Sequence, residues 1–174
     1  MEVTIEQVKS ALEPEEPDYD EAAKLGAAAL PHLQRLVESG DPNLGSKAAY
    51  LAGRIGDTNA LPVLEAAAAS SNPGIRTAAA GGARHLPGNV ADAILLLLVD
   101  DESTGVRKMA LRSVPEIPSL ELAEKLNARR TLEQEPAIRD LADDVFDRVS
   151  RVNREAEREP PIAPSDSEGG NNVD

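Results

Sequence analysis

Apolar side chains recur along the chain at intervals of four, four and three residues, the spacing that places them on one face of an α-helix. The stripe appears four times, and equivalent positions lie 31, 31 and 32 residues apart. Shorter apolar stretches lie between the stripes, so each unit is predicted to be a helical hairpin. The four aligned columns of the second helices are Leu44, Ile75, Val106 and Ile138; Ala48, Ala79, Ala110 and Ala142; Ala52, Ala83, Val114 and Phe146; and Ile55, Leu86, Ile117 and Val149.

A fixed period of this length is typical of a repeat architecture in which neighbouring units share one core. We therefore predict an all-α fold, an α-solenoid of about four helical hairpins with an N-terminal capping helix. Residues 1–29 would hold the capping helix, an acidic loop and a degenerate half-repeat, and residues 30–157 the repeat array. Residues 158–174 are predicted to be a disordered acidic tail, because they offer little apolar surface to bury.

The motifs of the first complete unit resemble a known family. The segment DPNLGSKAAYLAGRIGDTNALPVL, residues 41–64, resembles a HEAT repeat of the short kind first recognised in phycobilisome bilin lyases. The shared features are the Asp-Pro turn, the paired alanines, Leu-x-Gly-x-Ile-Gly-Asp and Ala-Leu-Pro. The resemblance extends over about residues 30–152 and implies a HEAT-like solenoid. The chain departs from the family at Gly45, where Arg is usual, and in the third unit, where VPEIPSLEL replaces the Gly-Asp turn.

Three arginines, Arg76, Arg107 and Arg139, occupy one column directly after the apolar residue that opens each second helix. The resemblance implies a structural ladder in which such arginines bond to Asp or to backbone carbonyls of neighbouring turns. The planar guanidinium carries five donors and suits that role. The alternative is a stacked row of cations that binds an acidic partner.

Composition narrows the classes of function. The chain of 174 residues contains no Cys and only 2% aromatic residues, so its core must be built from Ala, Leu, Val and Ile. The formal net charge of −13 argues against non-specific binding of a phosphate backbone, which needs a surplus of Lys and Arg. The longest apolar run, AILLLLV at residues 93–99, is too short to span a membrane. With no secretory signal pattern at the N-terminus, we expect a cytoplasmic protein without a membrane partner.

No catalytic constellation stands out. The run GDPNLGSK at residues 40–47 imitates a phosphate-binding loop, but its Ser and Lys are in the wrong order and Pro42 removes a donor. The two histidines, His32 and His85, lack the spacing of metal ligands. We therefore expect no catalytic residues, no metal and no cofactor.

The polar side of the second helices is the remaining candidate surface. In HEAT-like arrays these helices line a concave groove. Tyr50 is the candidate anchor for a partner, the middle of the groove is basic and its far end is acidic. Gly81 is expected on the groove face, whereas Gly82 is expected to face neighbouring helices and permit close packing. The predicted groove residues are Tyr50, Gly53, Ala80, Gly81, Arg84, Lys108, Leu111, Arg112, Asp140 and Asp144.

Three functions remain open at this stage. The first is a non-catalytic scaffold that binds a protein or peptide segment in the groove. The second, implied by the family resemblance, is a subunit of a bilin lyase or a similar modifying enzyme. The third is a HEAT-like array that binds nucleic acid, which the acidic composition disfavours.

Overall fold

The computed structural model of the protein describes residues 3–156, and all regular elements in that range are helices. Two short helices, α1 (Ile5–Leu12) and α2 (Tyr19–Ala22), come first, followed by the 3-10 turns Ala23–Leu25 and Ala27–Ala29. Four hairpins follow: α3 (Leu30–Val37) with α4 (Pro42–Ile55), α5 (Leu61–Ala68) with α6 (Pro73–Ala83), α7 (Gly88–Leu98) with α8 (Thr104–Ser113), and α9 (Leu120–Leu132) with α10 (Pro136–Ala156). A further 3-10 turn, Thr58–Ala60, precedes α5.

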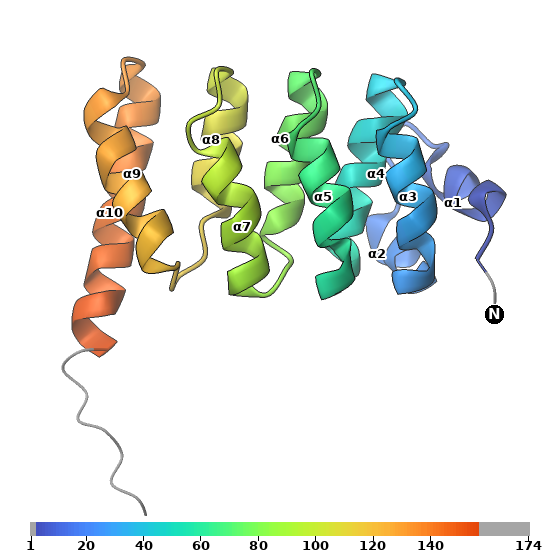
Figure 1. Ribbon diagram of the computed structural model, residues 1–174, viewed down its shortest axis with the longest axis horizontal. Helices are drawn as coiled ribbons and strands as arrows, with labels where there is room; N and C mark the ends of the chain where they lie inside the picture. Colours follow the sequence, from blue (N-terminus) through green and yellow to red (C-terminus); the bar gives the residue numbers. More distant parts are fainter. Residues whose placement is uncertain (1–2, 157–174) are drawn as a thin grey trace, which may run out of the picture.

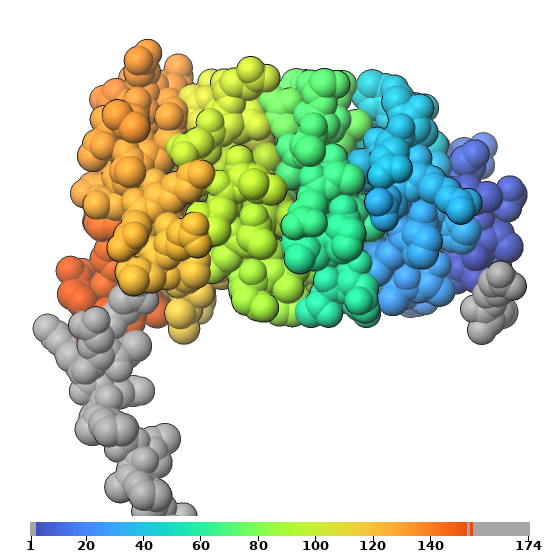
Figure 2. All heavy atoms as spheres, in the orientation of Figure 1, coloured from blue at the N-terminus to red at the C-terminus, as the bar shows by residue number. Residues whose placement is uncertain are grey.

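The hairpins stand side by side in a row, with α3, α5, α7 and α9 in one layer and the second helices in the other (Figure 1). Figure 2 shows the face of the first helices, where successive units abut along the row. The predicted all-α solenoid is confirmed. The predicted disordered tail concerns residues 158–174, which lie outside the described range.

The turn chemistry of the sequence explains where the second helices begin. Asp41 and Asn72 are N-caps whose side chains accept hydrogen bonds from the backbone N–H groups two and three residues later. Pro42 and Pro73 follow in the first turn, where the missing N–H costs little. Gly56 ends α4 in the left-handed conformation with a φ of 72°, which glycine adopts without strain.

Small side chains form the centre of the second-helix layer. Ala48, Ala79, Ala110 and Ala142 are each at most 1% exposed, as their shared column predicts. The first helices contribute a matching column of larger residues, each at most 1% exposed: Leu33, Leu64, Leu95 and Leu126. The core therefore runs the length of the array as one continuous cluster.

The closest helix contact joins α4 to α6 through glycine. A Cβ atom added to Gly53 would lie 2.4 Å from the Cα and carbonyl oxygen of Gly82. A Cβ added to Gly82 would lie 3.3 Å from the carbonyl oxygen of Ala49 and 3.4 Å from the Cα of Gly53. The two backbones thus touch directly, and the expectation that Gly82 permits close packing is confirmed.

The N-terminal segment is tied to the first hairpin by polar contacts. The Lys47 ammonium donates hydrogen bonds to the carbonyl oxygens of Leu12 at 3.1 Å and Pro14 at 2.6 Å. The ring of His32 bonds to the carbonyl oxygen of Val3 at 2.8 Å, and Arg54 forms an ion pair with Asp20. These contacts explain why an acidic, proline-containing segment lies against the array.

The third unit departs from the predicted core. Ile117 was expected in the buried column of Ile55, Leu86 and Val149, but it is 67% exposed. The reason is that α8 ends at Ser113, so residues 114–119 form a loop and the helical spacing no longer applies. The departure from the family pattern in VPEIPSLEL thus coincides with a shortened helix.

The outer side of the last hairpin is polar. The Arg130 guanidinium carbon lies 4.3 Å from the centroid of the Phe146 ring, and its Nη1 donates to Asp143 at 3.1 Å. Phe146 shares a column with Ala52 and Ala83, which are fully buried in the preceding units. Arg130 therefore covers an apolar position that the earlier units bury by packing helix on helix.

The glycine contact generates a stability prediction. Gly53→Ala should lower the free energy of unfolding by about 1–3 kcal/mol, because its methyl group meets the backbone of α6 rather than a movable side chain. Gly81→Ala is the matched control, since its Cβ would find only ordinary contacts at 3.6 Å. The free energy of unfolding of Gly81→Ala should be unchanged or higher by up to about 1 kcal/mol, because alanine favours the helix more than glycine does. Chemical denaturation measures both, and equal stabilities would contradict the close contact.

Candidate functional site

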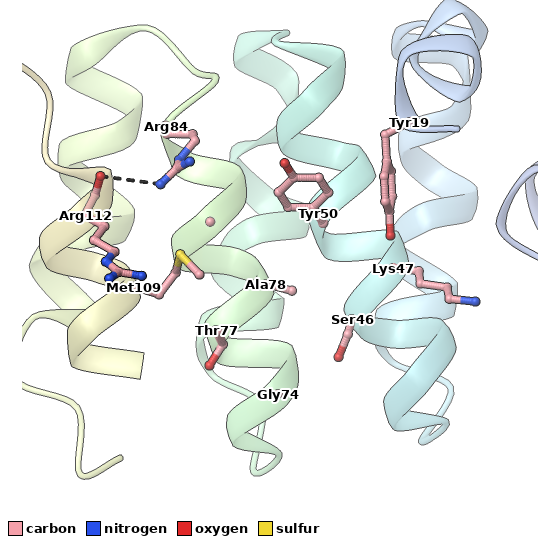
Figure 3. Close-up of a pocket in the computed structure, with 11 residues that line it drawn as sticks. Tyr19, Ser46, Lys47, Tyr50, Gly74, Thr77, Ala78, Arg84, Met109 and Arg112 are labelled. Carbon is pink, nitrogen blue, oxygen red and sulfur yellow. Dashed lines mark hydrogen bonds between the residues drawn. The ribbon is translucent and has the colours of Figure 1, made fainter. Parts of the chain in front are cut away.

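A hollow of about 440 Å³ opens on the side of the second helices. We call this cavity the hollow. Tyr19 from α2 and Tyr50 from α4 form one wall, and Arg84 from α6 and Arg112 from α8 form the other (Figure 3). The remaining lining residues are Ser46, Lys47, Gly74, Thr77, Ala78, Gly81 and Met109.

The aromatic wall is a packed pair of tyrosines. The ring centroids of Tyr19 and Tyr50 are 4.8 Å apart with an interplanar angle of 79°, an edge-to-face arrangement. The hydroxyl of Tyr50 lies 3.4 Å from Nε2 of His85. Burial, with smaller contributions from Arg54 and Arg84, lowers the pKa of His85 below its ordinary value of 6.5, so the imidazole is neutral at pH 7.

The floor of the hollow depends on Gly81. A Cβ added there would lie 3.6 Å from the sulfur of Met109 and from the ring of Tyr50, which is ordinary van der Waals contact. Packing therefore does not require glycine at this position, in contrast to Gly82. Gly81 is itself buried, and its lack of a side chain leaves only a methyl-sized gap between Tyr50 and Met109.

The opposite wall is basic. Among residues 3–156, neither Arg84 nor Arg112 forms an ion pair, and the same holds for the exposed Lys108 near them on α8. The two arginines of this wall are joined by a hydrogen bond from Nη2 of Arg84 to the carbonyl oxygen of Arg112 at 3.5 Å (Figure 3). Two guanidinium groups thus face the hollow without a carboxylate.

The structure divides the predicted groove residues into three groups. Tyr50, Gly81, Arg84 and Arg112 line the hollow. Lys108 is exposed on α8 outside the lining, and Asp140 and Asp144 are exposed on α10, also outside it. The third group was expected on the surface but is buried: Gly53, Ala80 and Leu111.

The prediction that Gly53, Ala80 and Leu111 line the groove was wrong. Each inner second helix packs against a second helix on both sides, so the part of its surface beside the hollow is covered by the next unit. Ala80 is fully buried and Leu111 is 1% exposed. Gly53 lies in the backbone contact with Gly82. None of the three presents a side chain to a partner in the groove.

Sequence reasoning missed several residues of the hollow, among them Met109, Ala78 and Tyr19. Lys47, Ala78 and Met109 occupy equivalent positions in three successive units, next to the positions that were predicted to line the groove. A prediction that included this further set of equivalent positions would have found them. Tyr19 lies at the start of α2, in a stretch read as an acidic loop, and its rarity as one of two tyrosines was the available signal.

The arginine column forms hydrogen bonds along the hairpin loops. Arg76 donates to the carboxylate of Asp101 in the next unit, at 2.7 and 3.0 Å, and to the carbonyl oxygen of Ser70 at 2.9 Å. Arg107 repeats the arrangement with the carboxylate of Glu133 at 2.8 and 3.0 Å and the Asp101 carbonyl at 2.9 Å. Each of these arginines therefore connects its own loop to the loop of the following unit.

The ladder is incomplete at both ends. Among residues 3–156, Arg139 donates only to backbone carbonyls, those of Glu133 and Gln134. At the other end Gly45 replaces the first arginine, and a Cβ there would lie 2.8 Å from Cδ1 of Ile75. The acidic partners Asp101 and Glu133 were not predicted, since they lie in loops outside the helical columns.

The carboxylate of Glu133 is strongly perturbed. The hydrogen bond from Arg107, aided by one from Arg129, lowers the pKa of Glu133 from 4.5 to about 2 against the opposing effect of burial. Burial alone would raise the pKa of Asp101, but the bonds from Arg76 and from the Ser103 N–H lower it. Both carboxylates are therefore ionised at neutral pH, and the paired arginines are matched in charge.

The candidate metal ligands and the loop-like run at residues 40–47 have other surroundings in the structure. Within residues 3–156, no three His, Asp or Glu side chains gather as metal ligands would. Lys47 of the loop-like run GDPNLGSK holds the N-terminal carbonyls, and Ser46 donates to the Pro42 carbonyl within its own helix. None of the helices in the same range has the length and apolar character of a membrane span.

Comparison with known proteins agrees with the repeat motifs. Residues 20–84 match the family model for HEAT repeats. A solved structure, the complex of CpcE and CpcF of phycocyanin lyase from Nostoc sp. PCC7120, contains a chain that is 22% identical with a TM-score of 0.65. The match covers 81% of this chain and 96% of that one. No curated protein has a significantly similar sequence. Residues 20–84 thus carry HEAT repeats, and the resemblance of the chain to the lyase type is confirmed at the level of the fold.

The buried pair of Arg107 and Glu133 generates a pH prediction. A carboxylate whose pKa is lowered by folding stabilises the folded state above pH 4.5, and that contribution is lost as the pH falls toward 2. Glu133→Gln should lower the free energy of unfolding at neutral pH by up to about 3–5 kcal/mol, the cost of breaking a buried pair. Its melting temperature should also fall less steeply than the wild type's in acid. If the melting temperatures of the variant and the wild type fall by the same amount between about pH 5 and pH 2, Glu133 does not carry this dependence.

Proposed function

We propose that the protein is a non-catalytic HEAT-repeat scaffold that binds a segment of another protein in the hollow. The observation that supports this proposal most directly is the hollow itself, whose floor includes Ala78 and Met109. It is flanked by aromatic rings on one side and, on the other, by two arginines that have no carboxylate partner among residues 3–156. Exposed aromatic side chains and arginines are the residues most often important at protein interfaces.

The shape of the fold is consistent with this role. The hollow draws its lining from α2, α4, α6 and α8, so a bound segment would contact three consecutive units at once. Repeat arrays bind partners along extended surfaces of this kind. The phycocyanin lyase protein with the similar fold was solved as a complex of two proteins, which supports a protein partner here as well.

A second candidate function is a subunit of a bilin lyase or a similar modifying enzyme. The structural match to a phycocyanin lyase favours it. At this identity the match carries the fold, and fold alone does not carry activity. Incubation of the purified protein with a bilin separates the two candidates, since a lyase subunit would shift the absorption spectrum of the pigment and a protein scaffold would leave it unchanged.

Blocking the hollow tests the scaffold function. Gly81→Leu would place a side chain larger than the methyl-sized gap between Tyr50 and Met109, and would push these two side chains into the hollow. We expect this variant to remain folded and to lose a partner that wild-type protein captures from the native cell. The matched control is Leu97→Ala, which changes a residue that is 57% exposed on the first-helix layer.

The control should capture the partner as wild type does. If Gly81→Leu also retains it while folded, the partner binds elsewhere and the hollow is not the site. If Leu97→Ala loses it and Gly81→Leu does not, the first-helix face is the binding surface.

A further inference from the structure

We infer that the segment bound in the hollow is acidic and carries one apolar side chain as its anchor. The apolar side chain would pack against Tyr50, Ala78 and Met109, and the neighbouring carboxylates would pair with Arg84 and Arg112. This inference rests on the proposed function and adds the chemistry of the partner.

The basic residues of α4, α6 and α8 differ in whether they have a partner. Arg54 pairs with Asp20, Arg76 with Asp101 and Arg107 with Glu133, so the neighbouring arginines are matched with acids. Lys47 is held by two carbonyl oxygens. Within the described range, Arg84 and Arg112 differ from all of these in having no carboxylate within 4.0 Å.

That difference is notable in a chain with 31 acidic and 18 basic residues. Acidic side chains are abundant, yet the two arginines at the rim of the hollow remain without one among residues 3–156. Their positive charges are near each other, because Nη2 of Arg84 reaches the carbonyl of Arg112. A pair of guanidinium groups at one rim favours a ligand with carboxylates, which they can bind with two parallel hydrogen bonds.

The floor of the hollow is apolar and suits an apolar side chain. The space beside the arginines is bounded by the ring of Tyr50, the thioether of Met109 and the methyl group of Ala78. Figure 3 shows Ala78 and Met109 between Tyr50 and Arg112. Methionine adapts its shape to different apolar partners, so this floor suits a Leu, Met or Phe side chain.

The charges around the hollow disfavour a basic segment. The aromatic wall offers no free carboxylate toward the hollow, because no Asp or Glu is among its lining residues. His85, behind Tyr50, is neutral at pH 7 and faces the cations of Arg54 and Arg84. A Lys-rich or Arg-rich segment would meet only like charge at the far wall.

The experiment uses the full-length protein and three short fluorescent peptides. Each peptide carries one Phe, placed in a run of Glu and Asp, of Ser, or of Lys. Binding is measured by fluorescence anisotropy at low and high salt, with wild type, Arg84→Glu, Arg112→Glu and Gly81→Leu. Lys125→Glu is the matched charge-reversal control, since Lys125 lies on α9 and pairs with Asp100 away from the hollow.

We expect wild type to prefer the acidic peptide over the other two. Each arginine reversal should weaken that binding by about tenfold or more, high salt should weaken it as well, and Gly81→Leu should abolish it. Lys125→Glu should leave the affinity within about twofold of wild type, since its charge lies on α9 away from the hollow.

Other outcomes overturn the inference in distinguishable ways. If the Ser or Lys peptide binds best and Gly81→Leu blocks it, the hollow is a binding site but its partner is not acidic. If no peptide binds and Gly81→Leu also leaves capture of the native partner intact, the proposed function fails too. If deleting residues 158–174 strengthens binding of the acidic peptide, the occupant of the hollow is the chain's own acidic C-terminal segment rather than a partner.

Discussion

The backbone contact between α4 and α6 sets the geometry of the middle of the array. Gly53 and Gly82 bring the two helices so close that a single methyl group on Gly53 has no space. Small residues, Ala48, Ala49, Ala79 and Ala80, surround this contact and are fully buried. The spacing of α4 and α6 in turn determines how far Tyr50 stands from Gly81 and Met109. The hollow is therefore a consequence of packing two helices through glycine and alanine rather than through larger side chains.

The two edges of the second-helix layer are held by different chemistry. Toward the hairpin loops, Arg76 and Arg107 connect successive units through buried carboxylates, and each bond satisfies a group that would be costly to bury alone. The arginine ladder begins only at the second unit. The first unit has Gly45 in that column and relies on direct packing against Ile75. The glycine contact near the C-terminal ends of α4 and α6 and the ion pairs near the hairpin loops therefore both keep the units in register.

The repeat period made most of the fold predictable from sequence. The four hairpins and the buried alanine column follow from helical spacing and from equivalent positions about 31 residues apart. The candidate site was predictable in part, because a helical wheel gives directions around one helix but not how much of each face its neighbours cover. That is why Tyr50, Arg84 and Arg112 were placed at the hollow, whereas Ala80 and Leu111 proved to be buried. Tyr19, Asp101 and Glu133 lie outside the aligned columns, and their positions depend on how the chain returns in three dimensions.

The central claim is that the glycine contact fixes the separation of α4 and α6 and, through it, the hollow. The most direct measurement is a crystal structure of the Gly53→Ala variant. We predict that α4 and α6 move apart and that the hollow widens between Tyr50 and Met109, while the bonds of Arg76 to Asp101 and Arg107 to Glu133 are retained. An unchanged separation of the two helices, with the methyl group accommodated in place, would contradict the account.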